Sequence, residues 1–174
     1  YDAVEVPALI PAHWLGNRYG QAWPGVVEDI DLDGMFTDVQ PRWLIEQAER
    51  FYTSLGFAPL PATFWERSDL YELPADSERK KNTHASAWHI DLDQDVRCLM
   101  NVTNDFTWFA TAHHELGHIY YYVEYTNPDV PLLLRGGANR AFHEGVGTMI
   151  ELAAAQRNFL VGRGLLPAEG DSDR

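Results

Sequence analysis

The chain has 174 residues, a length that suits one folded domain. It is 45% hydrophobic and 13% aromatic, which excludes an intrinsically disordered tail. It lacks the run of about 18 apolar residues that a transmembrane helix needs. The net charge of −13 argues against nucleic-acid partners and anionic membrane surfaces. Cys98 is the single cysteine, so no disulfide forms within these residues and the cellular compartment stays open.

The first part of the chain predicts helices separated by loops. Residues 11–28 mix aromatic residues with glycine and predict a helix entering a loop, and residues 29–34 predict an acidic loop. Pro41 opens a helix, because the first helical turn accepts proline, and Gly56 ends it. Its apolar residues recur at helical spacing: Trp43, Leu44, Ile45, Ala48, Phe51, Tyr52 and Leu55. Residues 73–82 are charged and predict an exposed loop.

The middle of the chain predicts a hairpin followed by a long helix. Residues 85–90 and 96–102 flank a polar segment and read as two short strands joined by a turn. Asn104, Asp105 or Thr107 can cap the next helix, which runs to about Tyr125. A proline in the segment 127–129 ends it.

A second long helix is expected near the end of the chain. A glycine-rich loop at residues 136–139 precedes it, and an apolar face extends it over roughly residues 140–161. Gly162 and Gly164 mark its end. The expected fold class is mainly α with one small β-hairpin.

The helix ending near Tyr125 carries the sequence His114-Glu115-Leu116-Gly117-His118. Residues four apart lie on one face of a helix, so both imidazoles can reach one metal ion. This is the H-E-x-x-H signature of zinc peptidases, in which the glutamate acts on a metal-bound water. A chance occurrence of the motif in a helix, with exposed or hydrogen-bonded histidines, is the alternative.

A catalytic zinc site needs a third protein ligand, and Glu144 is the best candidate. It lies in the first turns of the next helix, which a helix–loop–helix return brings back over the first. Gly145 and Gly147 are expected to let the two backbones approach closely. The alternative is that Glu144 only stabilises the helix dipole.

Four neighbouring residues are weaker candidates. We expect Glu124 and Glu151 to be solvated or salt-bridged. Adjacent residues point about 100° apart on a helix, so either His143 or Glu144 should face away, and His113 should turn away from the metal.

The implied chemistry is hydrolysis by a metal-activated water at one Zn²⁺ per chain. Glu115 would be the general base and would pass the proton to the leaving amine, without binding the metal itself. The two-histidine, one-carboxylate set keeps a net positive charge that suits a developing oxyanion.

The hairpin before the metal helix offers a site for a peptide. An exposed strand edge can pair with an extended substrate backbone. Ala85, Ser86 and Ala87 are small enough for this approach, and His84 can donate a hydrogen bond. A purely structural edge strand is the alternative.

Several segments together resemble the angiotensin-converting enzyme family of peptidyl-dipeptidases. They are His84-Ala-Ser-Ala-Trp88, Ala112-His-His-Glu-Leu-Gly-His-Ile119, Gly137-Ala-Asn139 and Phe142-His-Glu-Gly-Val-Gly147. Upstream, Ile10-Pro-Ala-His-Trp-Leu-Gly-Asn17 and Phe51-Tyr-Thr-Ser-Leu-Gly56 are similar as well. The likeness runs in order over nearly the whole chain.

This resemblance implies a zinc dipeptidyl carboxypeptidase of the gluzincin type on a larger helical, deep-clefted fold. It implies His114, His118 and Glu144 as zinc ligands and Glu115 as general base. It also implies that His84 and Ala85 contact the backbone of a peptide substrate. An exported or periplasmic location is favoured by the resemblance alone.

Three departures from the family pattern stand out. The disulfide of the animal members would fall at Thr83 and Asn101, so it is absent, which favours a bacterial-type member. An aspartate usually follows the glutamate ligand by four residues and supports a ligand histidine, and Thr148 stands there. Residues 135–139 read Arg-Gly-Gly-Ala-Asn where the family has Arg-Glu-Gly-Ala-Asn.

The family's enzymes are also several times longer than this chain. Residues 1–174 are therefore expected to form a single domain or the incomplete central part of a larger peptidase domain, with the remainder of the polypeptide as a partner. The groups that hold the substrate carboxylate, and most of the motif for an activating chloride, fall outside these residues. The alternatives are a metal-binding but inactive fragment and a non-catalytic structural homologue.

Overall fold

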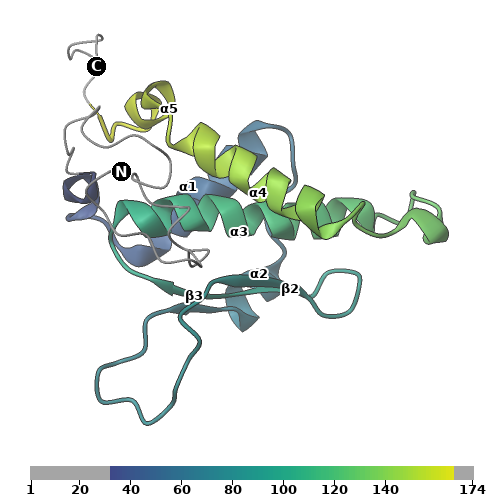
Figure 1. Cartoon of the computed structure of the whole chain (residues 1–174), viewed down its shortest axis with the longest axis horizontal. Coiled ribbons are helices and arrows are strands. Elements are labelled where there is room, and N and C mark those ends of the chain that lie inside the picture. Colours follow the sequence, from purple (N-terminus) through teal and green to yellow (C-terminus); the bar gives the residue numbers. More distant parts are fainter. Residues whose placement is uncertain (1–31, 167–174) are drawn as a thin grey trace, which may run out of the picture. The chain divides into compact units, whose positions relative to one another are not determined.

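A computed structural model describes residues 32–166 of the chain. Most of the ordered elements are helices, and three short strands form one small sheet (Figure 1), which confirms the mainly α prediction. No helix among these residues is both long and apolar enough to span a membrane. The helix expected at residues 11–28 and the first half of the acidic loop at 29–34 lie outside the described residues.

Helix α1 spans Pro41–Ser54 and begins and ends as predicted. Gly56 has a φ of 102°, a conformation that glycine adopts without steric cost. Its amide donates to the carbonyl of Thr53, and the amide of Phe57 donates to that of Tyr52, which is the Schellman pattern. The Phe57 and Tyr52 rings lie 5.9 Å apart, so the cap also adds an apolar contact. This end of α1 lies against the metal-motif helix, where Tyr52 is buried.

The sheet contains one strand more than predicted. After the short helix α2 (Ala62–Arg67), strand β1 (Asp69–Tyr71) pairs in parallel with β3 (Val96–Val102), and β2 (Ser86–His89) pairs with β3 in antiparallel orientation. The order β1-β3-β2 leaves β2 at an edge. Side chains of β3 alternate between buried and half-buried positions, as a strand with one face on a core requires. A two-stranded hairpin was therefore an incomplete prediction.

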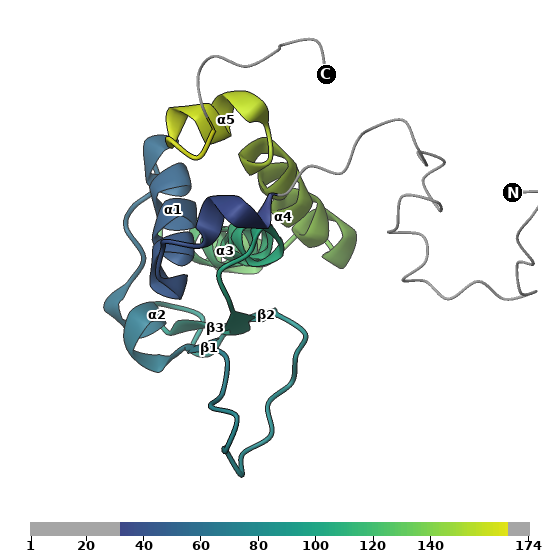
Figure 2. The same ribbon diagram turned by 90° about the vertical axis from the view of Figure 1, so that its left-hand side faces the viewer.

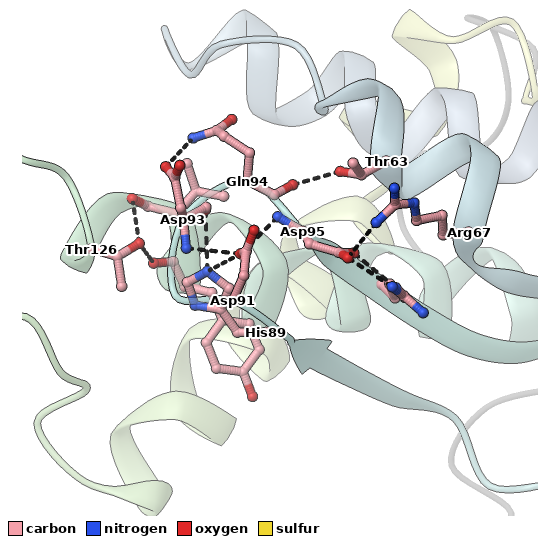
Figure 3. Close-up of polar contacts among 11 residues, drawn as sticks. Thr63, Arg67, His89, Asp91, Asp93, Gln94, Asp95 and Thr126 are labelled. Carbon is pink, nitrogen blue, oxygen red and sulfur yellow. Dashed lines mark hydrogen bonds and ion pairs between the residues drawn. The ribbon is translucent and has the colours of Figure 1, made fainter.

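A tight polar loop joins β2 to β3 (Figure 3). One oxygen of Asp91 accepts hydrogen bonds from the amides of Asp93 and Asp95, each at 2.9 Å. The Asp95 carboxylate in turn binds Arg97 and Arg67 at 2.7 Å, and the hydrogen bonds from Arg97 and then Arg67 lower the pKa of Asp95 to about 2. These contacts hold the turn and therefore the edge strand β2 in a defined place.

Helix α3 spans Phe106–Tyr125 and lies at the centre of the described residues. The side chain of Asp105 caps it by accepting a 2.8 Å hydrogen bond from the amide of Trp108. Helices α1 and α4 and the sheet all pack against α3, on different sides of it (Figure 2). Consequently α3 buries residues all round its first four turns, among them Phe109, Leu116 and Ile119.

The second long helix is divided in two. Helix α4 spans Arg140–Ala154 and α5 spans Arg157–Gly162, so the prediction of one helix over 140–161 was wrong. The break lets Phe159 turn back onto Phe51 and His113, with ring centroids 5.1 and 5.8 Å away. The half-buried Phe159 ring thus contacts the core from a separate short helix, an arrangement that depends on tertiary contacts rather than on local propensity. Gly164, with a φ of 73°, ends the segment as expected.

Candidate metal centre

The metal motif lies where the backbones of α3 and α4 come unusually close. A Cβ atom on Gly117 would lie 2.8 Å from Cα of Gly147 and 2.9 Å from the hydroxyl of Tyr52. A Cβ atom on Gly147 would lie 2.9 Å from the imidazole of His114. Gly147 thus permits the approach as predicted, whereas Gly145 has open space around it and contributes nothing. Gly117, within the motif itself, was not predicted to matter.

Three side chains from α3 and α4 converge above this contact. The Oε2 atom of Glu144 lies 3.2 Å from Nε2 of His114 and 3.6 Å from Nε2 of His118. The two imidazole rings are 4.9 Å apart and nearly perpendicular. Asn139 caps α4 by accepting a hydrogen bond from the amide of Phe142, which sets the start of the helix and places Glu144 in its second turn.

These distances suit a tetrahedral zinc ion. With metal–ligand bonds of about 2.0–2.1 Å, neighbouring ligand atoms lie about 3.3 Å apart. The Glu144 oxygen is near this value for both histidines. Glu115 also groups with His114 and His118, and the ligand atoms of these three residues all lie within 4.8 Å of one another. Both Glu144 and Glu115 therefore bring a carboxylate oxygen near the two imidazoles, as a ligand or a neighbour of a metal ion requires.

The second nitrogen of each imidazole also has a partner. Nδ1 of His114 lies 3.0 Å from Oε2 of Glu151, and Nδ1 of His118 lies 2.7 Å from Nδ1 of His143. The hydrogen bond with Glu151 raises the pKa of His114, whereas burial lowers the pKa of His118 to about 4. Glu151 is thus ion-paired, which is one of the two alternatives predicted for it. His143 and Glu144 both contact histidines of α3, although one of the two was expected to face away.

Glu115 follows His114 on α3 and groups with the two motif histidines. Its side chain is buried and its Oε2 atom has no hydrogen-bond partner among the described residues. Burial raises the pKa of Glu115 to about 7, with the nearby charge of His114 acting in the opposite direction. A carboxylate with such a pKa can accept and return a proton near neutral pH.

His113 faces away from this site, as predicted. It is fully buried, and its Nδ1 donates a 2.7 Å hydrogen bond to the carbonyl of Phe109. The aromatic rings of Phe51, Phe109 and Phe159 surround it. Burial lowers the pKa of His113 to about 4, so it is neutral in the core.

The histidines open onto a cleft of about 700 Å³. His84 and Ala85 line it together with His114 and Glu115, so all six predicted site residues border one hollow. The lining also includes residues that the motif does not suggest: Tyr122, Tyr125, Asn139, Arg140 and His143. The hydroxyl of Tyr122 donates to the carbonyl of Ala87, which ties α3 to the edge strand β2.

An H-E-x-x-H helix whose two imidazoles lie close to a glutamate of a facing helix is typical of zinc metallopeptidases. Sequence comparison agrees with this class. The profile of a peptidase family described as angiotensin-converting enzyme matches residues 1–174. The chain therefore belongs to the angiotensin-converting enzyme family.

Individual members of that family are similar over most of the chain. Angiotensin-converting enzyme of Oryctolagus cuniculus is 36% identical over 178 residues, covering 96% of this chain. That of the leech Theromyzon tessulatum is 36% identical over 169 residues, covering 91%. The angiotensin-converting enzyme-related protein of Drosophila melanogaster is 36% identical over 179 residues, covering 95%. The matched region spans only 13% of the rabbit protein and 27% of the other two.

Proposed function

We propose that the protein is a zinc-dependent peptidyl-dipeptidase that binds one Zn²⁺ per chain through His114, His118 and Glu144. The observation that carries this proposal is the position of one Glu144 oxygen, 3.2 and 3.6 Å from the two Nε2 atoms. Membership of a peptidase family supports the same function. The substrate is a peptide, from which the enzyme releases a C-terminal dipeptide.

Glu115 is the general base in this proposal. A zinc ion held by these residues would polarise the scissile carbonyl and lower the pKa of a water molecule toward 7. The buried Glu115 carboxylate, whose Oε2 atom has no partner among residues 32–166, would accept a proton from the attacking water and deliver it to the leaving amine. Burial, which raises the pKa of Glu115, favours the uptake of a proton by this carboxylate.

The edge strand β2 and the residues before it would hold the substrate backbone. β2 pairs with β3 on one side only, so its other edge can accept an extended peptide. Ala85 has a small side chain, and His84 lines the same cleft. The remainder of the protein would supply the rest of the cleft, and we retain the prediction of an exported or periplasmic location.

Zinc content of the intact protein, at its full natural length, tests the ligand assignment. We expect about one zinc per chain by elemental analysis, and a loss of that zinc in Glu144→Ala after dialysis. Glu124→Ala is the matched control, because its exposed side chain makes no hydrogen bond or ion pair with residues 32–166. Stoichiometric zinc in Glu144→Ala would rule out the assignment.

Product analysis by mass spectrometry tests the reaction. A peptide with a free C-terminus should lose its last two residues as a dipeptide. Release of single amino acids, or internal cleavage alone, would contradict a peptidyl-dipeptidase while leaving the zinc site intact.

A further inference from the structure

His114 lies between two carboxylates that contact opposite sides of its ring. Oε2 of Glu144 is 3.2 Å from Nε2, and Oε2 of Glu151 is 3.0 Å from Nδ1. Glu151 therefore cannot share the ion with His118, because it lies on the side of the ring that faces away from the convergent Nε2 atoms. Its contact needs a different explanation from that of Glu144.

The chemistry of imidazole supplies this explanation. A neutral ring carries one N–H and one lone pair, and a carboxylate can only accept. Glu151 therefore favours the tautomer in which Nδ1 carries the hydrogen and donates it. The lone pair then lies on Nε2, which is the nitrogen that faces Glu144 and His118. The hydrogen bond also fixes the rotation of the ring about its bond to Cβ.

The register of α4 explains how both carboxylates reach one ring. Residues three and four positions apart share a face of a helix, so Glu144, Gly147 and Glu151 form one row. The His114 ring lies over Gly147, whose missing side chain leaves the space that the ring occupies. Glu144 approaches from the turn before this glycine and Glu151 from the turn after it.

Two other positions on α4, Thr148 and His143, do not bring a second carboxylate to Nδ1 of a motif histidine. Thr148 is exposed and stands where the family resemblance leads one to expect an aspartate. His118, by contrast, meets the imidazole of His143, whose pKa is lowered by burial. Among residues 32–166, Glu151 is thus the carboxylate that contacts a motif histidine at Nδ1.

We propose that Glu151 is the positioning residue of His114, holding the tautomer and orientation in which Nε2 binds zinc. This inference rests on the proposed function and assigns the support of one ligand to a position three residues beyond Thr148. Partners of this kind typically contribute 10- to about 100-fold to metal affinity.

Zinc dissociation constants of the intact protein, measured by competition with a chelator of known affinity, test the inference. We expect Glu151→Ala to weaken zinc binding by about 10- to 100-fold. Glu151→Gln should weaken it less, because the amide oxygen still accepts from Nδ1 but carries no charge. Glu124→Ala should bind zinc as the wild type does. In the cobalt-substituted protein, Glu151→Ala should also shift the visible absorption bands.

Unchanged zinc affinity in Glu151→Ala, with Glu144→Ala deficient in zinc, would overturn this inference and leave the proposed function standing. A wild-type protein that holds no zinc would instead overturn the proposed function. A purely structural contribution of Glu151 predicts a lower melting temperature of the zinc-free variant with unchanged zinc affinity, which would also overturn the inference. If Glu151→Ala does not fold, as judged by circular dichroism, Glu151→Gln decides by the same criterion.

Discussion

His113 and His114 are neighbours in the chain but belong to two different regions of the molecule. His113 is fully buried among phenylalanines from α1, α3 and α5, and its Nδ1 is bonded to the backbone. His114 faces α4, where both ring nitrogens meet carboxylates. The same side chain is a neutral core residue on one face of α3 and a metal-ligand candidate on the next. The element packed against each face determines which it becomes.

The largest expected effect separates these two histidines. His114→Ala should lose zinc binding by more than the roughly 100-fold typical of an outer partner, since a direct ligand is removed. His113→Leu should keep zinc, because its ring points into the aromatic core. Zinc affinity and the melting temperature of both variants check this, and a comparable loss of zinc in both would abolish the distinction between the faces.

Glu115→Gln should keep zinc and lower kcat for peptide hydrolysis by about 10²- to 10⁴-fold. The amide has the size of the carboxylate but cannot accept the proton. Steady-state kinetics and zinc analysis on the same sample measure both quantities. Turnover at the wild-type rate would exclude Glu115 as the base.

A third comparison uses two glycines on α4. Gly147→Ala places a methyl group 2.9 Å from the His114 ring and should weaken zinc binding by about tenfold or more, because the ring has to move. Gly145→Ala has open space and should leave zinc affinity unchanged, while adding about 0.5–1 kcal/mol of helix stability. Equal zinc affinities in the two variants would show that the close contact does not hold the ring.

The smallest effect is expected on the α1 side of α3. The hydroxyl of Tyr52 donates a 2.9 Å hydrogen bond to the carbonyl of His113, so Tyr52→Phe should cost about 1 kcal/mol of stability. Zinc affinity should stay at the wild-type value. Denaturant unfolding gives the first quantity, and a marked loss of zinc in this variant would mean that the two faces are coupled.

Local pattern and spacing predicted the elements that carry their own signals. The caps of α1 and α3, the apolar periodicity of α1, the alternation in β3 and the four-residue spacing of His114 and His118 are visible without any tertiary information. Strand β1 was missed because three residues carry no period and depend on pairing with β3. The break before α5 was missed because the contacts that Phe159 makes with Phe51 and His113 are tertiary and leave no local signal.

Around the metal centre, the missed residues are those whose importance arises between helices. Gly117 matters because Gly147 and Tyr52, which belong to two other helices, leave no space for a side chain at this position. The partnership of Glu151 with His114 depends on the orientation of α4 against α3. The available signal in the sequence was Thr148, which stands where the family resemblance leads one to expect an aspartate. A carboxylate, Glu151, follows it about one helical turn later.

The most direct test of the account is anomalous X-ray diffraction at the zinc edge from crystals of the zinc-loaded intact protein. We predict one strong peak per chain, within about 2.0–2.2 Å of Nε2 of His114, Nε2 of His118 and a carboxylate oxygen of Glu144, with Glu115 unbound. A peak coordinated by Glu115 in place of Glu144, or located away from α3 and α4, would contradict it.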